Sequence, residues 1–269
     1  MDLHTVTDYT VARSRDDLAW EPGTAFVGGG TWLFSEPQPH LSRLVDLSGL
    51  DWPASLLGDA GLEIAATCTV EELSALSDTE IWTAAPLFRQ CADALLASWK
   101  IWKRATVGGN ICLSLPAGAM ISLAVALDAD AVIWSRDGDE KRVPVEQFVT
   151  GAGGNILRDG DVLRSIRIAP RLLDSRTAMR KISLSPLGRS GAVVIGRLDT
   201  DGAFTLSITA ATTRPYVLRF PGVPSPADLE AAHAAHVPAD AYYADVHGTP
   251  RWRRAVTQVL AQEVREELS

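Results

Sequence analysis

The chain has 269 residues, with 25 Lys and Arg against 33 Asp and Glu, and it carries a formal net charge of -8. Apolar residues make up 46% of the sequence and charged residues 22%, which is typical of a globular protein that buries a sizeable core. The acidic balance argues against nucleic acid as a partner, because duplex binding requires a basic surface that displaces counterions.

No stretch approaches the ~18 apolar residues that a membrane span needs, so we expect no membrane partner. The first ten residues lack the basic and apolar regions of a Sec signal. We therefore expect a soluble, cytoplasmic protein.

In the first half of the chain, apolar runs predict alternating strands and helices. Thr69 and Glu72 match a capping box that begins a helix at residue 70. In chain order, the expected elements are strands over 24–27, 43–47 and 62–66, then helices beginning at 70 and covering 86–97 and 116–127.

In the second half, Asp137 and Gly138 mark a hairpin turn, and the composition changes near Pro170. We place a domain boundary there, which gives domains 1–170 and 171–269. The expected elements are strands over 131–134, 141–143, 162–168, 192–195 and 204–210, then helices over 226–236 and 251–268. We expect the arginines of the last helix, among them Arg253, to face solvent or another subunit.

No metal-ligating or catalytic set of side chains is predicted. The three cysteines lie more than twenty residues apart without a Cys-x-x-Cys pair, so neither a disulfide framework nor an iron–sulfur cluster is expected. His233 and His236 have helical spacing but no third ligand nearby, and we interpret them as a solvated helix face. Ser114 lies outside any Gly-x-Ser-x-Gly motif, so a hydrolase has no support.

Two glycine clusters stand out, VGGGT at 27–31 and TVGGN at 106–110. Consecutive glycines let main-chain N–H groups turn toward one ligand and let that ligand approach the backbone, as a pyrophosphate requires. Leu33 stands where a dinucleotide-binding Gly-x-Gly-x-x-Gly motif has its third glycine, and no phosphate-binding GxxxxGK[ST] occurs. The residues alone leave two alternatives open, tight turns and a pyrophosphate site.

Nearly the whole chain resembles the FAD-binding medium subunit of molybdenum hydroxylases, the family of carbon monoxide dehydrogenase and xanthine dehydrogenase. Besides the first glycine loop, the matching segments are, in order, 43–50 (RLVDLSGL), 105–111 (ATVGGNI), 126–129 (ALDA), 148–151 (FVTG), 160–168 (GDVLRSIRI) and 245–254 (DVHGTPRWRR). The resemblance implies an α/β fold, a PCMH-type FAD-binding domain of two subdomains (about 1–54 and 55–170). An α+β domain of the CO-dehydrogenase-flavoprotein type follows at 171–269.

The resemblance also implies a function and partners. The chain would be an oxidoreductase subunit that binds FAD and passes electrons from a partner's [2Fe-2S] clusters to an external acceptor. Its partners would be a molybdopterin-binding large subunit and a [2Fe-2S] small subunit or domain. The absence of clustered cysteines agrees with this division, because the iron–sulfur centres must then reside on another chain.

The same resemblance implies the residues that hold FAD. Both glycine loops would grip the diphosphate, an apolar pair would pack near the rings, and a lysine near the flavin would stabilise its anionic reduced form. The implied residues are Val27, Gly28, Gly29, Gly30, Thr31, Trp32, Leu33, Ile101, Thr106, Gly108, Gly109, Asn110, Val162, Leu163 and Lys181.

Several positions depart from the family pattern. Leu113, Gly118 and Ala119 stand where the family has polar residues, and Trp32 replaces a small or acidic residue. The tryptophans at 32, 99 and 102 are interpreted either as an aromatic wall against the cofactor or as core and subunit packing. Two alternatives to the electron-transfer subunit therefore remain: a divergent assembly subunit with weak or lost FAD binding, and a stand-alone FAD oxidoreductase.

Overall fold

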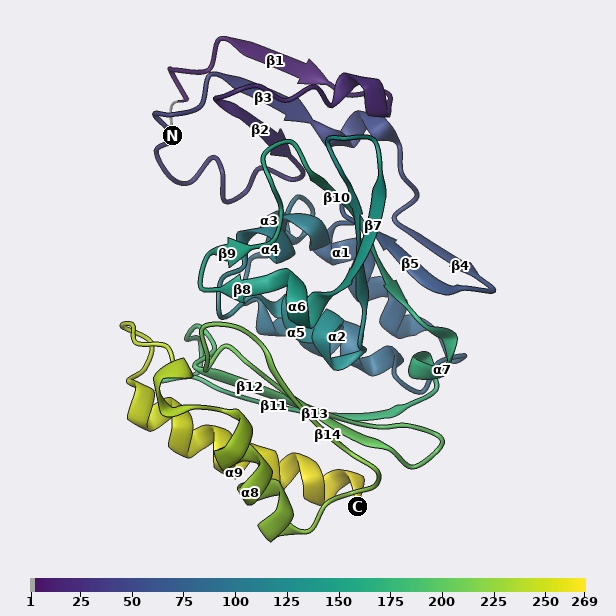
Figure 1. The fold of residues 1–269 in the computed structure, drawn as a ribbon, viewed down its shortest axis with the longest axis vertical. Coiled ribbons are helices and arrows are strands. Elements are labelled where there is room, and N and C mark those ends of the chain that lie inside the picture. Colours follow the sequence, from purple (N-terminus) through teal and green to yellow (C-terminus); the bar gives the residue numbers. More distant parts are fainter. Residues whose placement is uncertain (1–2) are drawn as a thin grey trace.

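The computed structural model describes residues 3–269 and arranges them as three main sheets that follow one another along the long axis (Figure 1). The first is a parallel sheet of order β1-β3-β2, formed by β1 (Asp8–Val11), β2 (Thr24–Val27) and β3 (Arg43–Asp46). Strand β2 runs directly into the first glycine cluster. The strands expected at 24–27 and 43–47 are confirmed, although β3 ends one residue earlier.

The second sheet is antiparallel, with the order β4-β5-β10-β6-β7. Its strands are β4 (Ser55–Gly58), β5 (Gly61–Ala65), β6 (Asp130–Trp134), β7 (Glu140–Pro144) and β10 (Val162–Ile168). Its helices are α1 (Val70–Ala75), α2 (Ala85–Ala94), α3 (Trp99–Trp102), α4 (Val107–Leu113), α5 (Ala119–Ala126) and α6 (Val145–Phe148). A short hairpin of β8 (Val149–Gly151) and β9 (Gly154–Asn155) follows α6.

The third sheet is antiparallel with the order β11-β12-β13-β14, and two helices cover one of its faces (Figure 1). After the short α7 (Pro170–Leu173) come β11 (Arg176–Ile182), β12 (Ala192–Leu198), β13 (Phe204–Thr209) and β14 (Tyr216–Phe220). The covering helices are α8 (Pro226–His236) and α9 (Pro250–Leu268). Both helices were expected within one residue of these bounds.

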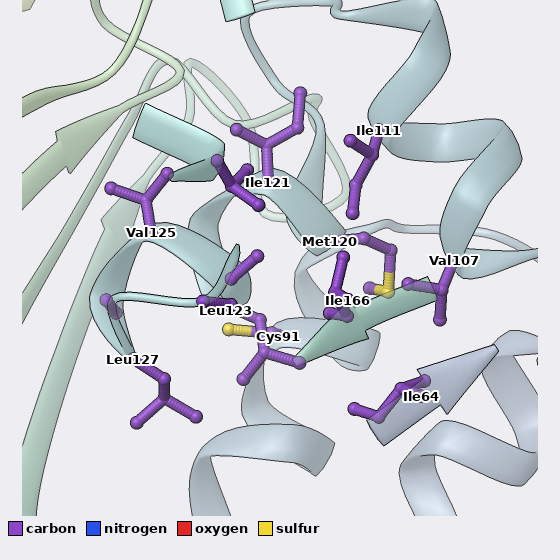
Figure 2. Close-up of a cluster of buried hydrophobic side chains, with 14 of the residues drawn as sticks. Ile64, Cys91, Val107, Ile111, Met120, Ile121, Leu123, Val125, Leu127 and Ile166 are labelled. Atoms are coloured by element: carbon purple, nitrogen blue, oxygen red, sulfur yellow. The ribbon is translucent and has the colours of Figure 1, made fainter. Parts of the chain in front are cut away.

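Helix α5 joins the second and third sheets into one core. All of its residues are buried, because it packs on α2 and α4 on one side and on β12 and β13 on the other. Figure 2 shows Met120 among side chains of α4, β5 and β10. The same buried cluster continues into the third sheet through Val193 and Ile195. The helix begins at Ala119 rather than at 116, since Gly118 is its N-cap.

Two expectations for the C-terminal helices are wrong at one residue each: Arg253 and His233 are buried, although His236 and the other arginines at the start of α9 are exposed. Arg253 is only 1% exposed and donates to the carbonyl oxygens of Gly191 (2.6 Å), just before β12, and Ala210 (2.7 Å), just after β13. His233 is 2% exposed, and its Nε2 lies 2.8 Å from the hydroxyl of Tyr242. Both side chains satisfy buried polar groups, a role that helical spacing does not reveal.

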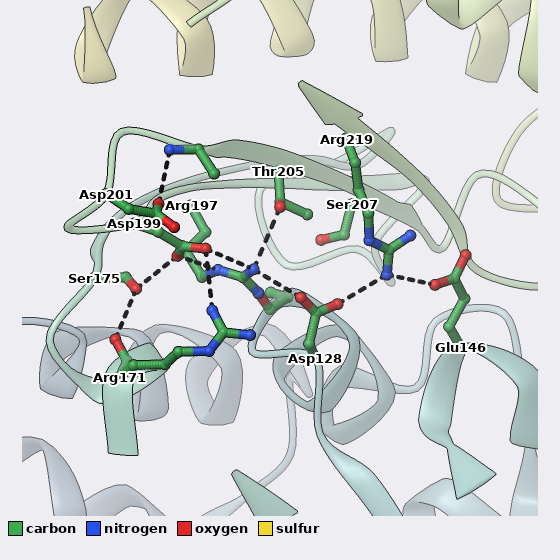
Figure 3. Close-up of polar contacts among 12 residues, drawn as sticks. Asp128, Glu146, Arg171, Ser175, Arg197, Asp199, Asp201, Thr205, Ser207 and Arg219 are labelled. Atoms are coloured by element: carbon green, nitrogen blue, oxygen red, sulfur yellow. Dashed lines mark hydrogen bonds and ion pairs between the residues drawn. The ribbon is translucent and has the colours of Figure 1, made fainter. Parts of the chain in front are cut away.

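A buried ion network ties the third sheet to the end of α5 (Figure 3). Arg197 of β12 is 2% exposed and donates to the carboxylates of Asp199 and Asp128 and to the carbonyl oxygen of Ala126, each at 2.7 Å. Arg219 of β14 extends the network to Asp128 (2.9 Å) and to a carboxylate of α6. Arg197 therefore holds together segments from both sides of the sequence boundary.

Among residues 3–269, none of the helices combines the length and the apolar character that crossing a lipid bilayer requires.

We predict that Arg197→Met lowers the free energy of unfolding by about 3 kcal/mol, because it removes the buried cation that bonds both carboxylates and leaves Asp199 with Arg171 (3.6 Å) and Asp128 with Arg219 (2.9 Å), two arginines that are largely exposed. Arg142→Ala is the control, since it breaks an exposed pair with Glu140 (3.5 Å) and is expected to cost less than about 1 kcal/mol. Urea unfolding of the full chain measures both. Equal losses in the two variants would contradict the network's role.

The protein is also predicted to lose stability in mild acid through His233. Burial, with a smaller contribution from Arg254, lowers the pKa of His233 below its ordinary value of 6.5. The unfolded chain therefore takes up this proton first, and the stability contributed by the neutral ring is present above 6.5 and lost as the pH falls below it. Urea unfolding between about pH 8 and about pH 5 should show a flatter pH dependence for His233→Phe than for the wild type.

Candidate functional site

The first glycine loop presents a run of main-chain donors that the chain itself does not use. The N–H groups of the five residues 29–33 donate no hydrogen bond to any acceptor within residues 3–269. Gly30 has a φ of 68°, which a side chain rarely adopts, and its carbonyl accepts from the N–H of Phe34 at 2.9 Å. The loop from Gly28 to Leu33 is half-buried apart from the exposed Trp32. Unpaired donors in a tight turn are suited to an anionic ligand.

In the second glycine loop, by contrast, the main-chain N–H groups already donate hydrogen bonds to acceptors within the chain. The N–H groups of Val107 and Gly108 donate to the carbonyls of Cys68 and Ala66, at 2.8 and 2.9 Å. The N–H of Gly109 donates to the hydroxyl of Thr106, the N-cap of α4, at 3.1 Å. The interpretation of this loop as a second cradle of free amides is therefore wrong.

The glycines of the second loop serve two different purposes. A Cβ at Gly108 would overlap Ala66, so this glycine permits close packing of α4 on the end of β5. A Cβ at Gly109 would meet only the Thr106 hydroxyl, at 3.0 Å, and space is otherwise open around it. The side-chain oxygen of Asn110 accepts from the N–H of Met120 at 3.0 Å, which ties the second loop to the start of α5.

The two loops touch each other. A Cβ at Gly29 would overlap the carbonyl of Arg104, and a Cβ at Gly28 would lie 2.7 Å from the Thr106 hydroxyl. The free donors of the first loop thus lie beside the open face at Gly109. The structure brings together residues that are about eighty positions apart in the sequence, and it does so through glycine contacts.

The other sequence-predicted residues lie in three places. Ile101 is 39% exposed on α3, just before the second loop. Val162 and Leu163 lie in β10 and are 3% exposed each, so they support the sheet on which α4 packs. Lys181 is exposed on β11, on the face it shares with Met179, which packs toward α2. In residues 3–269, no carboxylate forms an ion pair with Lys181.

Sequence reasoning missed two contributors to the loop contact. The ring of Phe34 covers Gly30, and the carbonyl of Arg104 fixes the position of Gly29. The Arg104 contact has no local signal, since a carbonyl contact is independent of side-chain type. In contrast, the departures at Gly118 and Ala119 belong to the packed core, where Ile121 fills the space beside Gly118.

The groups of the two glycine loops are suited to binding an anion by hydrogen bonds, and they are not acids or bases. The donors are neutral amides with the hydroxyl of Thr31 beside them, and no group of three or more metal-ligating side chains gathers within residues 3–269. A cavity of about 560 Å³ lies elsewhere, between α6 and β14, and no residue of either glycine loop lines it.

Comparison with known proteins gives the family. A model described as the FAD binding domain in molybdopterin dehydrogenase matches residues 5–171. The carbon monoxide dehydrogenase medium chain of Hydrogenophaga pseudoflava is 22% identical over 191 residues, which cover 70% of this chain and 64% of that protein. Caffeine dehydrogenase subunit beta of Pseudomonas sp. (strain CBB1) is 35% identical over 83 residues, 31% of this chain and 28% of that protein.

The matched regions thus span less than two thirds of the length of these two curated relatives. The fold agrees more widely. A chain in the structure of reconstituted CO dehydrogenase from Oligotropha carboxidovorans superposes with a TM-score of 0.80 at 22% identity, over 97% of this chain and 96% of that one. The predicted fold class is therefore confirmed, and the chain belongs to the family of FAD-binding domains of molybdopterin dehydrogenases.

Proposed function

We propose that this chain binds FAD with the diphosphate on the first glycine loop and acts as an electron-transfer subunit of a molybdenum hydroxylase. The observation that carries the proposal is the run of unpaired N–H groups at 29–33, next to the open face at Gly109. A diphosphate supplies the acceptors that these donors lack. The residues present therefore fit the diphosphate of FAD.

Partners follow from the same proposal. The two curated relatives are named as a medium chain and a subunit beta, so both are parts of larger enzymes. We infer that this chain assembles with a molybdopterin-binding large subunit and a [2Fe-2S] subunit or domain. FAD supplies the redox chemistry when bound, whereas this chain binds it, orients it and tunes its electrostatic surroundings. No side chain here needs to act as a nucleophile.

Among the alternatives, an assembly subunit without flavin also has an observation in its favour. The second loop uses its N–H groups for hydrogen bonds within the chain, so it offers none of them to a ligand. Purification and visible spectroscopy separate the two functions. Absorbance bands at about 370 and 450 nm support the flavoprotein. Their absence after incubation with FAD, while the large subunit still copurifies, would favour the assembly role.

We predict that Gly109→Val abolishes FAD retention and leaves the fold intact, because its side chain enters the open space beside the first loop. Gly108→Val is the matched contrast: it overlaps Ala66, so we expect it to lower the free energy of unfolding by about 1–3 kcal/mol or more. Flavin absorbance after gel filtration and urea unfolding measure the two effects. Full FAD retention in Gly109→Val would refute this position for the diphosphate.

Lys181→Ala is predicted to make the midpoint potential of bound flavin more negative without preventing FAD binding. The reason is that a cation near the ring stabilises the anionic reduced form. Arg180→Ala is the control, because Arg180 faces the other side of β11 and pairs with Glu263 and Glu267 of α9. Spectroelectrochemical titration measures the potentials. Equal potentials in the wild type and Lys181→Ala would remove Lys181 from the site.

A further inference from the structure

Trp32 differs from the other tryptophans in its surroundings. Each of the others contacts an aromatic ring, a cationic side chain or a closely packed glycine: Trp20, Trp52, Trp82, Trp99, Trp102, Trp134 and Trp252. Trp32 is 40% exposed, and within residues 3–269 no aromatic or cationic group lies against its ring. The Trp32 side chain is thus partly exposed to solvent and has no aromatic or cationic partner among these residues.

The main chain of Trp32 is nevertheless well anchored. Its carbonyl accepts from the N–H of Ser35 at 2.9 Å and from the Ser35 hydroxyl at 2.8 Å. The neighbouring turn is closed by the bond from the Phe34 N–H to Gly30. The ring is therefore attached to an ordered turn and not to a loose chain end.

Trp32 also belongs to the run of unpaired donors. It is the fourth of the five residues 29–33 whose N–H groups have no acceptor in the chain. An anion held by these groups lies beside the Trp32 backbone, so a planar group linked to that anion comes within reach of the indole. Phe34 is less suited to this role, because its ring already packs on Gly30.

We propose that Trp32 stacks on a planar ring of the dinucleotide whose diphosphate the first loop holds, and that it is a specificity-determining residue for that ligand. The inference rests on the proposed function, since it needs a nucleotide in the loop. Offset stacking of two aromatic rings removes both faces from water and adds a favourable quadrupole interaction. A ligand with a diphosphate and no ring would not gain this contribution.

The test uses the full chain freed of flavin and titrated with FAD, with binding followed by flavin absorbance. Trp32→Ala is expected to weaken FAD binding about 10-fold, the usual effect of removing a stacked aromatic residue. Trp32→Phe should restore binding to within about 3-fold, because it keeps a ring. Leu57→Ala is the control: Leu57 is 59% exposed on β4, which carries none of the implied FAD residues, and its loss should leave FAD affinity within about 2-fold.

Titration with ADP and with FMN identifies the ring. Weaker ADP binding in Trp32→Ala points to adenine, and weaker FMN binding points to the isoalloxazine ring. Equal FAD affinity in Trp32→Ala and the wild type would overturn the role of Trp32 while leaving the proposed function intact. Absence of FAD binding by the wild type would overturn both. Urea unfolding checks that Trp32→Ala stays folded: its transition should remain cooperative, with at most a modest decrease of its midpoint from the wild type, since the ring is only partly buried.

Discussion

The contact between the two glycine loops is the constraint on which the candidate site depends. Gly29 lies against the carbonyl of Arg104, and Gly28 lies against the hydroxyl of Thr106. The two loops approach each other more closely than residues with side chains would allow, so the contacts fix the separation of the first and second sheets. The N–H groups of residues 29–33 take no part in this contact, so they remain available as hydrogen-bond donors where the loops meet. The glycines therefore bring the two loops into contact at the place where the proposed diphosphate site lies.

The third sheet belongs to the same structural framework. The buried cluster around α5 contains residues on both sides of the boundary expected near Pro170, and Arg197 bridges the two sides with hydrogen bonds to Ala126 and Asp128. Helix α5 has eight residues that are all buried, so removal of the third sheet would expose apolar side chains of α5 to water. The position of Lys181 relative to the loops is consequently set by packing in the core and not by a flexible linker.

Much of this fold could be predicted from local patterns. Most strands with buried apolar residues, and helices such as α1 with its capping pair Thr69 and Glu72, were expected near their observed bounds, whereas strands β11 and β14 were not expected. Strands β1 and β4 were missed because their side chains are largely exposed and carry little periodic signal. Helix α4 was also missed, since two glycines near its first turn lower its helix propensity.

The site shows where such reasoning ends. The sequence marks both glycine clusters equally, yet only the first retains free donors, because the acceptors for the second are the carbonyls of Ala66 and Cys68 about forty residues earlier. No local pattern encodes that pairing. In the proposed site the two loops therefore have different roles: the first offers the hydrogen-bond donors for a diphosphate, whereas the second offers an open glycine surface at Gly109. Main-chain amides do not distinguish one diphosphate from another, so the proposal assigns ligand specificity to side chains around the first loop, where Trp32 lies.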